Sequence, residues 1–178
     1  MTGKKPSPAK RETVRRLVAE GARLLANRRP AEALARLNQA LDLEPDNVAA
    51  NINLAGAYIL QGKHDRAVPV LEKAAELDPS NAMVWSNLAA AYLGKLPFAT
   101  SEREDRAIQA YEHALVLDPS VPHVHYNLGL IYLERKDALR ATAHFSSALQ
   151  TDPSDRDARR WLDKLLSGEQ AELPGETA

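Results

Sequence analysis

The side chains that could do chemistry in this sequence are few and scattered. Its histidines are His64, His113, His123, His125 and His144. His123 and His125 are two residues apart, so on a helix they would point in different directions. The sequence has no cysteine, which excludes thiolate nucleophiles and cysteine metal sites, and it has no HExxH, GxSxG, phosphate-loop or dinucleotide-binding pattern. We therefore predict that the chain is not an enzyme and holds no metal or cofactor.

The composition indicates a helical protein with no nucleic-acid partner. Apolar residues form 44% of the chain and aromatic residues 5%, and a set dominated by alanine and leucine favours helices over strands. Lys and Arg number 23 against 24 Asp and Glu, so the whole chain has no basic field for a phosphate backbone. No apolar run approaches the ~18 residues of a membrane span, and residues 1–12 lack the apolar core of a secretory signal. A cytoplasmic protein is expected.

Regularly spaced prolines reveal an internal repeat. A proline follows an acidic residue at Pro45, Pro79, Pro119 and Pro153. Aligning the chain on them gives four units, 14–47, 48–81, 82–121 and 122–155. Within a unit, apolar residues recur at i, i+3, i+4 and i+7 twice over, and turn residues separate the two runs. Each unit is therefore predicted to be a helix, a turn and a second helix.

Each unit also has small residues where its two helices should cross. In the first helices these are Gly21, Ala55, Ala89 and Gly129, and in the second helices Ala33, Ala67, Ala107 and Ala141. A bulky side chain at these places would force the helix axes apart.

The repeat resembles the tetratricopeptide repeat (TPR) family. The family signature is followed by Trp85-x-x-Leu88 with Tyr92, and by Ala107-x-x-x-Tyr111. The resemblance implies an all-α fold, a right-handed α-α superhelix or TPR solenoid of four helix-turn-helix repeats covering 14–155.

The segments outside the repeats are expected to cap the array or to be loose. Residues 1–13 should form a basic tail and the start of the first helix, and 168–178 a flexible tail. Residues 156–167 should form a capping helix, because a repeat array needs a polar-faced end. Ser154 with Asp157 is the expected start of that helix, and Trp161 is an expected packing residue.

The resemblance also implies a binding site, because first helices line a concave groove in the TPR family. The corresponding positions are Arg15, Val18, Ile52, Asn53, Gly56, Met83, Asn87, Ala90, His123, Tyr126, Asn127 and Leu130. Asn53, Asn87 and Asn127 recur at one place and resemble the asparagine ladder of O-GlcNAc transferases, in which amides hold an extended backbone. Asparagine is common at this place across the family, so a packing role stays open. His123 and Tyr126 either contact the partner or pack against the terminal helix.

A clamp for chaperone tails, found in some family members, is not expected. The clamp positions in the first three units hold Val18, Ala22, Asn53, Met83 and Asn87. Only the asparagine at position 53 matches, and no cation would face the carboxylates. The partner segment is therefore expected to be apolar or mixed, either extended or an amphipathic helix.

The third unit carries six extra residues between its two helices. Ser101 and Glu104 form a capping-box pattern, so part of the insert should extend the second helix by about a turn. The remainder should be a loop over 95–99. Leu96 and Phe98 in this loop either pack locally or make a secondary contact.

These patterns predict a non-catalytic adaptor or scaffold for protein–protein interaction that binds a partner peptide or helix in the groove. The alternative is a self-associating structural subunit, a weak homo-oligomer that docks through the solenoid ends or through the 95–101 insert. Neither reading involves nucleic acid or a membrane span.

Overall fold

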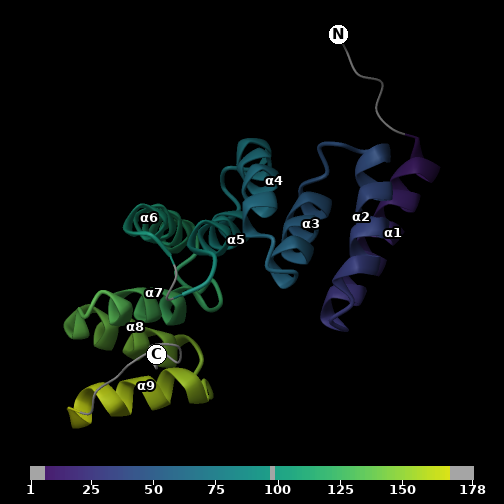
Figure 1. Ribbon diagram of the computed structural model, residues 1–178. Helices are drawn as coiled ribbons and strands as arrows, with labels where there is room; N and C mark the ends of the chain where they lie inside the picture. Colours follow the sequence, from purple (N-terminus) through teal and green to yellow (C-terminus); the bar gives the residue numbers. More distant parts are fainter. Residues whose placement is uncertain (1–6, 97–98, 169–178) are drawn as a thin grey trace.

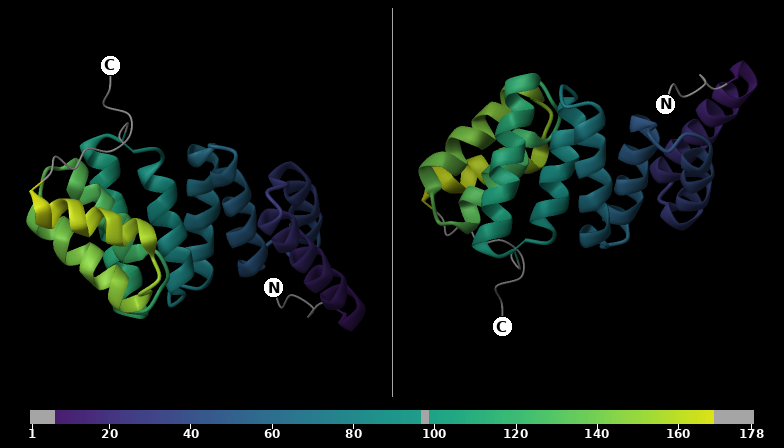
Figure 2. Two further views of the ribbon diagram at one scale, coloured as in Figure 1. Left: turned by 90° about the horizontal axis from the view of Figure 1, so that it is seen from below. Right: turned by 90° about the horizontal axis from the view of Figure 1, so that it is seen from above.

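The computed structural model describes residues 7–96 and 99–168, and within these ranges the chain folds into helices and loops without a strand. The helices are α1 (Pro8–Ala26), α2 (Pro30–Leu43), α3 (Val48–Leu60), α4 (His64–Leu77), α5 (Ala82–Leu93), α6 (Ser101–Leu117), α7 (Val124–Glu134), α8 (Ala138–Thr151) and α9 (Arg156–Ser167). They form helix-turn-helix pairs and a last single helix, stacked in chain order from α1 to α9 (Figures 1 and 2). The fold is an all-α solenoid.

The stack is curved, and its two sides differ. α3 and α5 lie on the inner side of the curve, whereas α4 and α6 lie on its outer side (Figure 1). On the inner side α1 contacts α3, and α3 contacts α5. The first helices of the first three pairs, α1, α3 and α5, therefore form a continuous face. No helix in the described part of the chain is long and apolar enough to cross a membrane.

Close helix crossings confirm the role predicted for two of the small residues, Gly21 and Gly129. A Cβ atom on Gly21 would lie 2.7 Å from the Leu37 side chain, and a Cβ atom on Gly129 would lie 2.7 Å from the Phe145 ring. Such a contact is too short for a real side chain. The absence of a Cβ thus lets α1 approach α2, and α7 approach α8, more closely than alanine would permit.

The insert lengthens one helix, as the sequence predicts, but the predicted cap is wrong by one residue. α6 has 17 residues, whereas α2, α4 and α8 have 14 each. The Thr100 side chain, rather than Ser101, accepts a hydrogen bond from the Arg103 backbone N–H. Glu104 cannot reach back to complete a capping box, because its carboxylate is buried and accepts from Arg135 Nε at 2.7 Å.

The cap of α9 also differs from the predicted one. Asp155 Oδ1 accepts from the backbone N–H groups of Asp157 and Ala158 at 3.0 and 2.9 Å. The Ser154 hydroxyl does not cap the helix and instead donates to Asp152 Oδ1 at 2.7 Å.

Candidate functional site

The side of the solenoid on which the first helices α1, α3, α5 and α7 lie is called the inner face below. These helices carry eleven of the twelve residues predicted to line the groove, and His123 lies immediately before α7. Arg15, Met83 and His123 are exposed, and the other nine are half-buried. All twelve therefore contribute to the molecular surface. Leu25 of α1 lies 3.8 Å from the position of a Cβ on Gly56 of α3, so successive helices join without a deep gap at this point.

Some apolar residues of this set pack against the core, whereas Met83 is exposed. Val18 packs against the cluster around Val14 and Leu17, and Ile52 against the cluster around Ala74 and Val84. Leu130 packs against the large C-terminal cluster. Met83 is the most open, at 47% exposure. The inner face is thus a shallow apolar surface, with Met83 available for contact.

The three asparagines at equivalent positions are not equivalent in their contacts. The Asn127 side chain interacts with Tyr111, a buried residue of α6. Burial raises the pKa of Tyr111, and the interaction with Asn127 opposes that rise. Among the described residues the amides of Asn53 and Asn87 have no hydrogen-bond partner, and both are half-buried. In the first two units the position of Tyr111 is occupied by Leu37 and Leu71. Neither leucine has a side-chain polar atom that could bind the amide of Asn53 or Asn87. Sequence spacing alone could not separate a committed asparagine from two available ones.

Tyr126 contacts the terminal helix. Its ring meets the Phe145 ring edge-on, with centroids 5.9 Å apart, and its side chain interacts with Trp161 of α9. Trp161 is 4% exposed, which confirms that it is a packing residue. Of the two predicted roles of Tyr126, packing against α9 is therefore observed.

The position of His123 in its repeat unit had implied that it lies on the first helix. In the structure His123 lies just before α7 and not on a helix. It occupies the N-cap position with φ 62°, in the left-handed region that side chains with a Cβ rarely adopt. With Tyr126, Asp152 and Asp155 it lines a cavity of about 390 Å³ between the start of α7 and the turn before α9. No spacing rule in the sequence signals this cavity, because it forms between two turns.

A second group that the sequence did not reveal is a pair of histidines. His125 Nδ1 and His144 Nδ1 are 3.1 Å apart, and the His144 ring is stacked on Tyr132 with centroids 5.4 Å apart. Burial, and the neighbouring His125, lower the pKa of His144 to about 4, and burial lowers that of His125. Both rings are therefore neutral at pH 7. Among the described residues no group of three or more His, Cys, Asp or Glu side chains is arranged to hold a metal ion.

The insert is fastened to both neighbouring units by arginines. Arg103 Nε donates to the Tyr92 carbonyl at 2.9 Å, and its Nη2 lies 3.0 Å from Asp65 of α4. Arg135 of the fourth unit reaches Glu104 and Asp105. Leu96 packs against the large core cluster, which is local packing rather than a free contact. Phe98 lies outside the described residues.

Two family profiles match the chain. One, described as tetratricopeptide repeat, covers residues 24–90, and the other, described as TPR repeat, covers 102–135. The chain therefore belongs to the TPR family. No curated protein matches its sequence.

Solved structures share this fold at low sequence identity. A structure titled functional characterisation of Pseudomonas aeruginosa pilF is 23% identical, covering 90% of this chain and 70% of that chain, with a TM-score of 0.78. MamA is 22% identical over 83% of each chain, with a TM-score of 0.67. The first TPR domain of Spaghetti (RPAP3), bound to the HSP90 peptide SRMEEVD, is 20% identical, covering 68% of this chain and 94% of that chain, with a TM-score of 0.59.

Proposed function

We propose that this protein is a non-catalytic adaptor whose inner face binds a segment of another protein. The observation that carries the proposal is the repetition of Asn53 and Asn87, two half-buried amides without a partner among the described residues. They stand on α3 and α5, two neighbouring helices with no charged residue. Each amide can donate to a backbone carbonyl and accept from a backbone N–H.

The apolar part of the inner face supports the same use. Met83 lies on α5, and half-buried Ile59 and exposed Leu60 end α3. An extended strand could place its backbone on the amides and its alternate side chains on these residues. The Spaghetti structure contains a TPR domain with a bound peptide, and adaptor activity in this chain is proposed by that analogy.

Quantitative affinity purification tests the proposal. Asn53→Ala/Asn87→Ala removes both available amides and leaves Asn127, which is committed to Tyr111. The matched control is Asn38→Ala/Gln109→Ala, which removes two exposed amides from α2 and α6. We expect the first variant to lose partner recovery and the control to keep it. Equal recovery with both variants, at equal helicity, would exclude the amide pair as the binding element.

Self-association is a second candidate because of apolar residues left open elsewhere. Leu139 at the start of α8 is 83% exposed, and Leu166 of α9 is 70% exposed. Sedimentation of wild type and Leu139→Ser/Leu166→Ser over a wide concentration range tests it. A wild-type monomer at every concentration would contradict self-association.

A further inference from the structure

Positive charge is concentrated at the start of the chain. Residues 1–36 hold ten of the 23 Lys and Arg residues but only three of the 24 Asp and Glu residues. The nearly neutral total therefore conceals a basic end and an acidic remainder. Such asymmetry indicates that the basic end has an electrostatic partner.

On the inner face this charge belongs to one helix. α3 and α5 contain no charged residue, whereas α1 contains five Lys or Arg and two Glu. Any recognition of charge by the part of the inner face formed by α1, α3 and α5 must therefore come from α1. The sign of that charge is positive.

The cations of α1 are in line with its apolar inner-face residues. Arg11, Arg15, Val18, Ala22 and Leu25 follow one another at spacings of four and three, which places them on one side of a helix. The first two are cationic and the last three are apolar. Since Leu25 reaches Gly56 of α3, the line runs from the basic start of α1 to the neutral helices.

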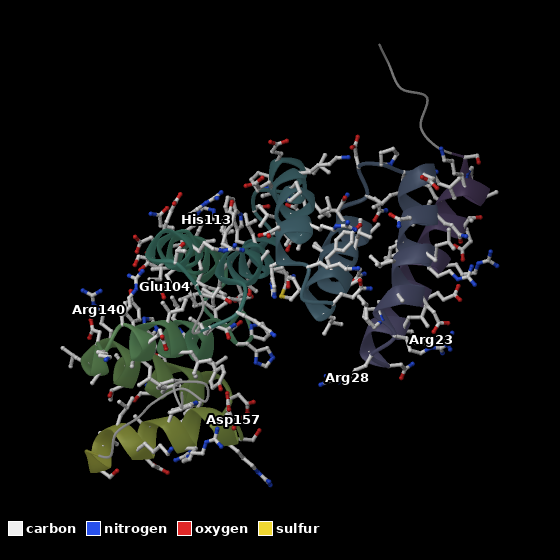
Figure 3. All side chains as sticks on the ribbon, viewed as in Figure 1. Arg23, Arg28, Glu104, His113, Arg140 and Asp157 are labelled. Atoms are coloured by element: carbon white, nitrogen blue, oxygen red, sulfur yellow. The ribbon has the colours of Figure 1, made fainter. Side chains whose placement is uncertain are left out.

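The basic residues of this line are accessible. Arg11 is exposed and forms no ion pair with any described residue, and the Arg15 side chain is 78% exposed, although it is paired with Glu12 at 2.6 Å. α1 is five residues longer than α2, and its residues 8–12 are all exposed. Arg23 and Arg28 add exposed positive charge at the other end of the same helix pair (Figure 3).

We propose that the α1 end of the inner face binds carboxylates, so that the partner is a protein segment with acidic residues beside its apolar ones. The inference rests on the proposed function and specifies its partner. Acidic residues would pair with Arg11 and Arg15, whose guanidinium groups can hold a carboxylate through two hydrogen bonds. The apolar residues would follow toward Leu25 and Met83, which fixes the direction of the bound segment.

The surface favours a protein segment over nucleic acid or lipid. Residues 1–57 contain no aromatic side chain, so this end offers no stacking platform for bases. The apolar side of α1, formed by Val14, Leu17 and Leu24, is buried, so it cannot enter a lipid surface. Carboxylates on a flexible segment require neither feature.

Two synthetic peptides test the inference. Both have the same apolar half, and the other half is rich in glutamate in one peptide and in glutamine in the other. Arg11→Glu/Arg15→Glu reverses the charge of the line, and Arg156→Glu/Arg159→Glu makes the same change on exposed residues of α9. We expect fluorescence anisotropy to show about tenfold weaker binding of the glutamate peptide to the α1 variant, and unchanged binding to the α9 variant. High salt should reduce the wild-type preference for glutamate.

Each other outcome overturns one statement. Equal affinity of the wild type for the two peptides, or equal losses in the α1 and α9 variants, would overturn the carboxylate site. If Met83→Glu keeps its affinity for the glutamate peptide, the peptide binds the basic end without using the inner face. This result would contradict the proposed function and not the carboxylate site. The wild type could instead self-associate, with the association abolished both by high salt and by the α1 substitutions. The basic end would then bind a second copy of this chain, which also overturns the inference.

Discussion

The two halves of the solenoid are built from different side chains. The C-terminal half shares one large core cluster that runs from α5 to α9 and contains buried Tyr111, Tyr132, Phe145 and Trp161. The N-terminal half has smaller clusters of leucine, valine and alanine, and no buried aromatic residue is found among the described residues of α1 to α4. We therefore expect the half with the continuous aromatic core to be the more stable one, and the proposed electrostatic contact lies in the basic, aliphatic half.

The largest expected effect is the loss of an aromatic ring from the C-terminal core. Phe145 is fully buried between α7 and α9, so Phe145→Ala should lower the free energy of unfolding by about 4 kcal/mol. The equivalent change in the N-terminal half, Leu37→Ala, should cost about 3 kcal/mol and leave the C-terminal half folded. Urea unfolding is followed by circular dichroism, which reports helix loss in both halves, and by the fluorescence of Trp85 and Trp161, which reports the C-terminal half. A larger global loss from Leu37→Ala would reverse the comparison.

Two glycines of the inner helices, Gly56 on α3 and Gly129 on α7, give the next largest difference. A Cβ on Gly129 would meet the rigid Phe145 ring at 2.7 Å, so Gly129→Ala should destabilise the protein by about 2 kcal/mol. Gly56 has only Leu25 nearby, at 3.8 Å, so Gly56→Ala should raise stability by about 0.5 kcal/mol through helix propensity. Melting curves of the two variants should shift in opposite directions. A shift in the same direction would show that the two crossings are alike.

Ion pairs should distinguish the halves less strongly. The Glu104 side chain is 8% exposed and bonds Arg135 of the next unit, so Glu104→Gln should cost about 1 kcal/mol. In the N-terminal half the Asp46 partner of Lys73 is 72% exposed, and Asp46→Asn should have little effect on stability. A double-mutant cycle measures the coupling free energy between Glu104 and Arg135. A coupling free energy of zero would contradict this expectation.

Acidification should produce the smallest effect, confined to the C-terminal half. The pKa of His144 is lowered from 6.5 to about 4 in the folded chain, so between these values the unfolded chain binds a proton that the folded chain does not. Stability should therefore fall as the pH is lowered through this window, and the half-exposed position of His144 should keep the change small. His144→Gln should flatten the dependence of the melting temperature on pH. An unchanged dependence would exclude the histidine pair as its source.

The sequence predicted the fold because the proline spacing and the apolar periodicity are local properties. The same reasoning predicted the helix extension at the insert, and it identified the close approaches at Gly21 and Gly129. It missed the caps at Thr100 and Asp155, because neighbouring Ser, Thr and Asp side chains compete for each cap position and local sequence does not decide between them. It also missed the His125–His144 pair, since residues on two helices meet only after the helices pack. The different status of Asn127 depends on a single hydroxyl, that of Tyr111.

Site-specific photocrosslinking tests the central claim most directly. The photoreactive residue p-benzoylphenylalanine is placed at position 83 on α5 or at position 116 on α6, where Met83 is 47% exposed and Val116 is 81% exposed. We expect the partner to crosslink at position 83, to disappear in the Asn53→Ala/Asn87→Ala background, and to be absent at position 116. Equal crosslinking at both positions, or crosslinking at position 116 alone, would contradict binding on the inner face.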